Sequence, residues 1–138
     1  MNKVDPKKIF AEGQSYSFTK RISAQDVDHF ARISGDANPL HMKDSFAQAR
    51  GFQGRVVHGA LLISYISQMI GMHLPGEGCL WQCLNIKFHA PCFIDDTVEI
   101  KATVAQVSSA VNTIVLEVSV DNFKTRSNLV KAKVQVGL

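Results

Sequence analysis

The sequence predicts an α+β fold in which a curved antiparallel sheet wraps around one long buried helix. Residues 57–74 place apolar side chains on nearly every side of a helix, which is typical of a helix buried in a core. From about residue 79 onward, apolar and polar residues alternate with a period of two, as in strands with one buried and one solvated face. A chain of 138 residues fits one domain, so we expect residues 1–138 to form a single domain.

This alternation predicts five strands. Pairs of turn-forming residues such as Asp95-Asp96 separate successive runs. Because the links between the runs are short, we expect successive strands to form an antiparallel sheet. In the first run after residue 79, we expect Leu84, Ile86 and Phe88 on the buried face. The predicted strands are residues 14–22, 84–88, 98–104, 114–120 and 130–136.

The helices lie in the first half of the chain. Ser23 and Asp26, three residues apart, resemble a capping box and predict the start of a helix. A second, short helix is expected at residues 43–49, and the helix of residues 57–74 ends at Leu74-Pro75-Gly76. The apolar run in that last helix is far shorter than the roughly 18 residues that a membrane span requires. The apolar residues at helical spacing in the first helix are Val27, Phe30, Ala31 and Ile33.

Composition and charge exclude several classes of protein. A chain with 46% hydrophobic and 20% charged residues is not disordered, and its net charge of +3 is scattered rather than massed in a nucleic-acid-binding stripe. Three cysteines at irregular spacing fit no disulfide framework, and Cys79-x3-Cys83 lacks the second pair of a zinc site. The first 14 residues show no signal or transit peptide. We therefore expect a cytoplasmic protein with no metal, no nucleic-acid partner and no membrane span.

An acid and an imidazole lie close together in the segment between the first helix and the buried one. In Gly35-Asp36-Ala37-Asn38-Pro39-Leu40-His41, glycine and proline shape the backbone of a loop. The Asn-Pro turn can bring Asp36 and His41 within about 5–6 Å, the separation at which both side chains can hold one water molecule. A purely structural interpretation is also open, in which Asp36 caps a turn and His41 merely packs.

The start of the buried helix offers a site for a developing negative charge. Val57-His58-Gly59 opens this helix, and its first N–H groups have no partners within the helix. Gly59 has no side chain to block an approaching carbonyl, so its N–H can serve an oxyanion. The alternative is a glycine that serves only packing at a helix start. Together with Asp36 and His41, this helix start suits acid–base chemistry beside a thioester carbonyl.

The motif and its surroundings resemble the MaoC-like, R-specific enoyl-CoA hydratases of the hot-dog fold. The resemblance is carried by residues 30–41 (FARISGDANPLH), 57–62 (VHGALL) and 74–78 (LPGEG). It extends over nearly the whole chain, from about residue 8 to 136. It implies a single hot-dog domain, usually a homodimer, whose long central helix is wrapped by the sheet.

The resemblance also implies roles for individual residues. Asp36 and His41 match the family's catalytic pair, and Asn38 matches the residue that supports their loop. Gly59 matches the backbone donor to the thioester carbonyl. Ser67, two turns further along the helix, matches a polar residue near the active site, although its hydroxyl can instead bond the carbonyl of Ile63, four residues before it.

The activity implied is that of a hydro-lyase of fatty acid metabolism. Water adds reversibly to a trans-2-enoyl thioester to give an (R)-3-hydroxyacyl thioester, with coenzyme A or acyl carrier protein as part of the substrate and no separate cofactor. We expect Asp36 to act as the main base toward water and His41 to protonate Cα, and the reverse assignment stays open. Two alternatives are a hot-dog acyl-CoA thioesterase and a non-catalytic acyl-thioester-binding protein.

Further residues are candidates for contacts with the substrate. His58 can line the site, although a structural role is common at such a position. Tyr65, Met69 and Ile70 are expected to meet the acyl end, where the bulk of Tyr65 would shorten the pocket. Arg50, Arg55 and Lys87 are candidates to contact coenzyme A phosphates, although single basic residues are usually only solvated.

Overall fold

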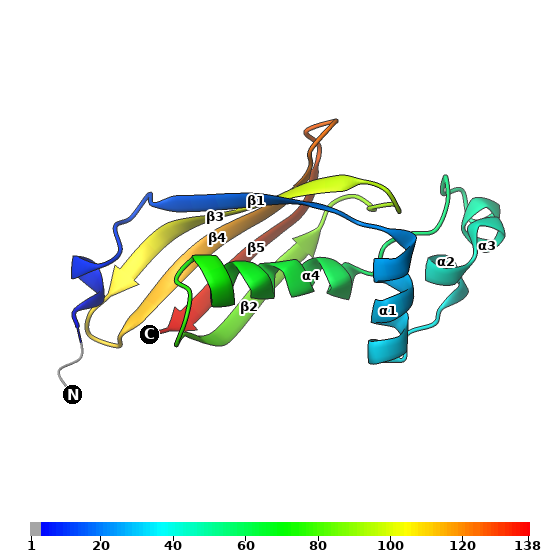
Figure 1. The fold of residues 1–138 in the computed structure, drawn as a ribbon. Coiled ribbons are helices and arrows are strands. Elements are labelled where there is room, and N and C mark those ends of the chain that lie inside the picture. Colours follow the sequence, from blue (N-terminus) through cyan, green and yellow to red (C-terminus); the bar gives the residue numbers. More distant parts are fainter. Residues whose placement is uncertain (1–3) are drawn as a thin grey trace.

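The computed structural model describes residues 4–138, which form one curved five-stranded sheet with a helix lying along its inner face (Figure 1). The strands are ordered β1-β3-β4-β5-β2, and every neighbouring pair is antiparallel. This confirms an antiparallel sheet wrapped around one helix. The strand bounds are β1 Ser15–Arg21, β2 Leu80–Phe88, β3 Thr97–Ser108, β4 Thr113–Asn122 and β5 Asn128–Gly137.

The helices fall into a central helix and a group at one end of the sheet. The central helix α4 runs from Gly59 to Gln68 and continues as a π-helical turn, η2 (Met69–His73). Helices α1, α2 and α3 gather at the end of the sheet where α4 begins (Figure 1). None of the helices in residues 4–138 is long and apolar enough to cross a membrane. The remaining bounds are η1 Pro6–Lys8, α1 Ala24–Ser34, α2 Pro39–Met42 and α3 Asp44–Ala49.

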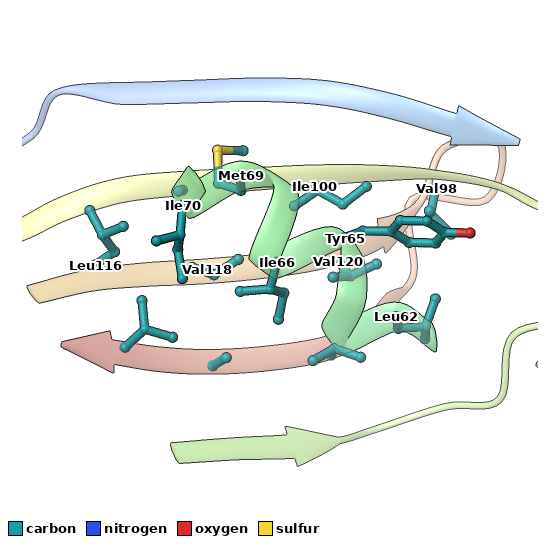
Figure 2. Packing of buried hydrophobic residues seen from close by; sticks show 14 of the residues in the cluster. Leu62, Tyr65, Ile66, Met69, Ile70, Val98, Ile100, Leu116, Val118 and Val120 are labelled. Atoms are coloured by element: carbon teal, nitrogen blue, oxygen red, sulfur yellow. The ribbon is translucent and has the colours of Figure 1, made fainter. Parts of the chain in front are cut away.

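The hydrophobic core lies between α4 and the inner face of the sheet. Ile66 and Met69 are fully buried there, and Figure 2 shows them among the inward-facing residues of β3 and β4. The residues that alternate with these on the strands face outward, as the period of two predicts. The arrangement confirms the hot-dog fold. The buried strand residues are Val98, Ile100, Ala102, Val104, Val107, Thr113, Ile114, Leu116, Val118, Val120, Leu129, Val130, Ala132, Val134 and Val136.

The pairing of β2 differs from the simple succession of strands that the sequence suggests. β2 pairs with β5 rather than with β3, so it forms an edge of the sheet. An edge strand is covered from fewer sides than a central one. Leu84 and Ile86 are therefore only half-buried and Phe88 is 51% exposed, where full burial on one face was expected.

The helical predictions were confirmed in part. Ser23 and Asp26 form the predicted capping box at the start of α1. Ile33 was expected on the buried face of this helix, but it is 82% exposed, because at 3.6 residues per turn it lies about 160° around the helix from the buried Ala31. The short helix at 43–49 corresponds to α3. No helix was predicted at α2, and α4 begins at Gly59 rather than at residue 57.

All three cysteines are free. Cys92 is buried in the core, and this burial raises the pKa of its thiol to about 12. A thiol with such a pKa stays protonated at neutral pH and is a poor nucleophile. Cys92 therefore acts as a small core residue.

Candidate active site

Asp36 lies in a tight loop between α1 and α2. The loop begins at Gly35, the C-cap of α1, whose φ of 78° is a left-handed conformation that favours glycine. Asp36 Oδ1 accepts a hydrogen bond from the backbone N–H of Asn38 at 3.2 Å, and Asp36 N–H donates to Ser34 Oγ at 3.1 Å. Asp36 thus caps a turn with one carboxylate oxygen. Its other oxygen, Oδ2, faces His41.

His41 lies in α2, which is a single helical turn. Asn38 is the N-cap of α2, and its Oδ1 accepts a hydrogen bond from Leu40 N–H at 3.0 Å. Pro39 follows at the first helical position, where its missing N–H costs nothing. The Nδ1 atom of His41 lies 2.7 Å from the carbonyl oxygen of Val56. Because a carbonyl can only accept, Nδ1 carries a proton, and Nε2 is the ring nitrogen that faces Asp36.

The side chains of Asp36 and His41 meet at the surface of the fold. His41 Nε2 lies 3.8 Å from Asp36 Oδ2. The His41 side chain is 14% exposed, whereas that of Asp36 is 51% exposed and open to solvent. A water molecule can hydrogen-bond to two atoms separated by up to about 5–6 Å. The pair can therefore hold one water molecule between a carboxylate and an imidazole.

His58 joins this pair from the start of the central helix. It is the N-cap of α4 and only 1% exposed. Its Nε2 lies 2.9 Å from the carbonyl oxygen of Asp36, and its ring stacks on that of His41 with the centroids 3.9 Å apart. Its Nδ1 is buried and has no hydrogen-bond partner among residues 4–138. A buried polar atom without a partner lowers the free energy of unfolding by about 1–3 kcal/mol, so the His58 ring makes the fold less stable.

The segment just before α4 holds the Asp36–His41 loop through hydrogen bonds from Arg55 and Val56. Arg55 Nε donates to the carbonyl oxygen of His41 at 2.6 Å, and its guanidinium pairs with Asp28 Oδ1 at 2.5 Å. Val56 N–H donates to the carbonyl oxygen of Leu40 at 3.1 Å. Arg55 was a candidate for coenzyme A phosphates, but the structure turns its side chain toward Asp28 and the His41 backbone, where it braces the loop.

Gly59 stands at the first position of α4, directly after His58. No hydrogen-bond acceptor for its N–H is found within residues 4–138. The N-terminus of a helix carries partial positive charge, so this N–H suits an oxygen on which negative charge develops. A Cβ atom placed on Gly59 would lie 2.8 Å from Cε1 of Phe88. The far end of the half-exposed Phe88 ring therefore lies where a side chain on residue 59 would begin.

Asp36, His41 and His58 also offer the atom types that bind transition metals. One ligand atom from each lies within 4.8 Å of the others. The two imidazole rings lie face to face with an angle of 27° between their planes. That no metal binds here stays a prediction.

Comparison with known proteins places this cluster in a family. A family model described as MaoC like domain matches residues 8–125, which is most of the chain. The chain belongs to the MaoC-like domain family. The match includes the Asp36–His41 loop and the start of α4, so the structural elements that form the cluster lie inside the family domain.

Individual relatives agree with this assignment of a MaoC-like domain. An (R)-specific enoyl-CoA hydratase from Rhodospirillum rubrum is 43% identical over 93 residues, which cover 67% of this chain and 65% of that protein. A mitochondrial 3-hydroxyacyl-(acyl-carrier-protein) dehydratase from Arabidopsis thaliana is 30% identical over 92% of this chain and 75% of its own length. The solved (R)-hydratase from A. caviae involved in PHA biosynthesis superposes with a TM-score of 0.90 at 30% identity, covering 94% and 97% of the two chains. The chain thus spans just under two-thirds of the Rhodospirillum protein.

Four further site candidates of this MaoC-like domain lie along the central helix. Tyr65, Met69 and Ile70 are buried and face the sheet (Figure 2). Burial raises the pKa of Tyr65 to about 12, so its hydroxyl stays protonated at neutral pH. Ser67 is exposed, and its hydroxyl makes no hydrogen bond within residues 4–138, so the bond to Ile63 that the sequence allowed is not formed. Roles for these four side chains toward a substrate stay predictions.

A surface hollow of the MaoC-like domain lies away from the acid–base cluster. It has a volume of about 700 Å³ and sits on the outer face of the sheet. Its lining includes neither Asp36 nor His41. Its cationic residues are Lys87, Lys101, Lys131 and Lys133.

Proposed function

We propose that this MaoC-like domain catalyses the reversible addition of water to trans-2-enoyl thioesters, giving (R)-3-hydroxyacyl thioesters. The observation that carries the proposal is the 3.8 Å approach of Asp36 Oδ2 and His41 Nε2 beside the open N-terminus of α4. Addition of water to an enoyl thioester needs a base, an acid and a donor to the carbonyl oxygen. The cluster supplies all three. The names of the relatives from Rhodospirillum rubrum and Arabidopsis thaliana describe the two directions of this reaction.

The chemical steps follow from the positions of these groups. The Asp36 carboxylate accepts a proton from the bound water, whose oxygen bonds to Cβ while the π electrons move toward the thioester oxygen. Gly59 N–H stabilises the charge on that oxygen. His41, as an imidazolium, then delivers a proton from Nε2 to Cα. A water molecule bridging the 3.8 Å between Asp36 Oδ2 and His41 Nε2 then relays the proton from Asp36 to His41 and restores both groups, and no separate cofactor takes part in these steps.

The substrate carries its own activating group as a thioester of coenzyme A or of acyl carrier protein. We propose Tyr65, Met69 and Ile70 as the contacts of the acyl end, with the Tyr65 ring limiting chain length. This proposal requires the helix to shift slightly from the sheet, because all three side chains are buried in the core. Asn38 supports the loop through its cap of α2. Ser67, exposed on α4, is proposed as a polar contact near the thioester.

The test of the proposed function is an assay with crotonyl-CoA and longer 2-enoyl-CoA thioesters. We expect loss of the enoyl absorbance without release of free thiol, and a kcat/KM that falls as the chain lengthens. Release of free thiol instead would identify the thioesterase alternative, whose water attacks the carbonyl. Binding without either change would identify a non-catalytic acyl-thioester-binding protein. Preference for long chains would contradict the proposed role of Tyr65.

We also propose that the domain works as a homodimer. The edge strand β2 leaves one row of backbone groups unpaired and exposes two large apolar side chains, Leu80 at 69% and Phe88 at 51%. An unpaired strand edge favours association with another chain. Light scattering should give twice the monomer mass of 15.2 kDa. A monomer with full hydratase activity would contradict this proposal while leaving the proposed reaction intact.

A further inference from the structure

We propose that His58 is a positioning residue that holds both members of the acid–base pair, an inference that rests on the proposed function. A single ring reaches Asp36 through a hydrogen bond to its carbonyl oxygen and His41 through stacking. The same residue is the N-cap of α4 and precedes Gly59. His58 therefore links the base, the acid and the carbonyl donor in one rigid unit.

The hydrogen bond to Asp36 fixes the protonation of the His58 ring. Nε2 lies 2.9 Å from a carbonyl oxygen, which can only accept, so Nε2 carries the proton. Nδ1 is buried and finds no partner among residues 4–138. As a neutral ring with its second nitrogen sealed from solvent, His58 is badly placed to exchange protons with the substrate. Its contribution is to orient its neighbours rather than to act as an acid or a base.

The loop depends on His58 because its other hydrogen bonds are local. Within residues 4–138, the backbone and Oδ1 of Asp36 otherwise bond only Ser34 and Asn38, each two positions away. The bond from His58 spans 22 positions and is the hydrogen bond that ties Asp36 to the central helix. Asp36 itself is exposed, so packing does little to hold it. Without this donor, we expect the carboxylate to sample positions away from His41.

Stacking holds the second member of the pair. The His41 and His58 rings lie nearly parallel, with an angle of 27° and centroids 3.9 Å apart. The ring centroid of Phe30 in α1 lies 4.9 Å from that of His58, so Phe30 packs the His58 ring against the first helix. His41 is further restrained by its Nδ1–H bond to Val56. The flat ring of His58 therefore restricts the orientation of the catalytic His41 imidazole.

Two substitutions separate these contacts. His58→Phe keeps a flat ring against His41 but removes the donor to the Asp36 carbonyl. His58→Gln restores a side-chain N–H donor but removes the ring. We expect His58→Phe to lower kcat for crotonyl-CoA by about tenfold or more with little change in KM, since a misplacement of about 1 Å can cost roughly 10²-fold. We expect His58→Gln to recover only the part of the lost rate that depends on the donor to Asp36, because glutamine lacks the ring that stacks on His41.

A destabilised core variant provides the matched control. Ile66→Val removes a methyl group from a fully buried position on the same helix, so it should lower Tm and leave kcat unchanged. His58→Phe removes a buried nitrogen that has no partner, so we expect a large loss of kcat with only a small fall in Tm. Wild-type kcat in folded His58→Phe would overturn the proposal. Equal losses of kcat in the Phe and Gln variants, in step with Tm, would overturn it as well.

A second measurement keeps this proposal separate from the proposed function. The ¹⁵N resonances of the His58 imidazole report which ring nitrogen carries the proton, whether or not the protein turns over crotonyl-CoA. We expect a neutral ring protonated at Nε2. A ring protonated at Nδ1 would overturn the proposed hold on Asp36. Absence of hydration with the expected ring state would instead count against the proposed reaction alone.

Discussion

Replacing Asp36 with asparagine is expected to lower kcat for enoyl-thioester hydration by roughly 10²- to 10⁴-fold, the usual contribution of a positioned acid or base. Asparagine has the same shape, and its carbonyl oxygen can still accept the hydrogen bond from Asn38 N–H that shapes the loop. It cannot take a proton from water. The fold should persist while the chemical step fails, and steady-state kinetics with circular dichroism would measure both.

The equivalent change at His41 is asparagine rather than alanine. An asparagine amide can take over the donation that His41 Nδ1 makes to the Val56 carbonyl, but it has no counterpart of Nε2. We expect a loss of kcat within the same range as for Asp36→Asn. Asp95→Asn and His29→Gln change exposed residues of the same types and should leave kcat unaltered. Near-normal turnover in either site variant would contradict the assigned chemistry.

Most of the fold could be predicted because hydrophobic periodicity reports burial directly. Residues such as Ile100 and Val118 alternate with polar neighbours and face the core as expected. The position of β2 could not be predicted, because alternation shows which face of a strand is buried and not which strand lies beside it. The exposure of Phe88 follows from that edge position. Ile33 follows Phe30 at helical spacing, but it lies on the side of α1 away from the buried Val27 and Ala31.

The candidate site, like the fold, could be predicted from the sequence only in part. Asp36 and His41 could be found because the Asn-Pro turn restricts a short segment that carries both groups. The contributions of Arg55 and Val56 depend on contacts about 15 positions apart in the sequence, for which local spacing gives no signal. From the sequence, Arg55 is a candidate contact of coenzyme A phosphates. In the structure, its side chain bonds Asp28 and the His41 backbone.

The contact between Gly59 and Phe88 offers a way to test the carbonyl donor separately from the acid–base pair. Phe88 comes from the last position of β2, and its ring lies where a side chain on residue 59 would begin. Gly59→Ala alone would force this ring to move, so its effect would mix a clash with any change in the donor. In a Phe88→Ala background, the obstruction is gone and the N–H can be altered by itself.

Proline at position 59 removes the N–H without requiring a change in backbone conformation. It is well tolerated at the first position of a helix, and His58 already has the extended conformation (φ −57°, ψ 131°) that the residue before proline prefers. We expect Gly59→Ala/Phe88→Ala to match Phe88→Ala in kcat/KM. We expect Gly59→Pro/Phe88→Ala to fall by about 10²- to 10³-fold, the usual cost of one lost oxyanion donor. Equal kcat/KM in the alanine and proline double variants, with matching Tm values, would show that the Gly59 N–H does not contact the thioester oxygen in the transition state.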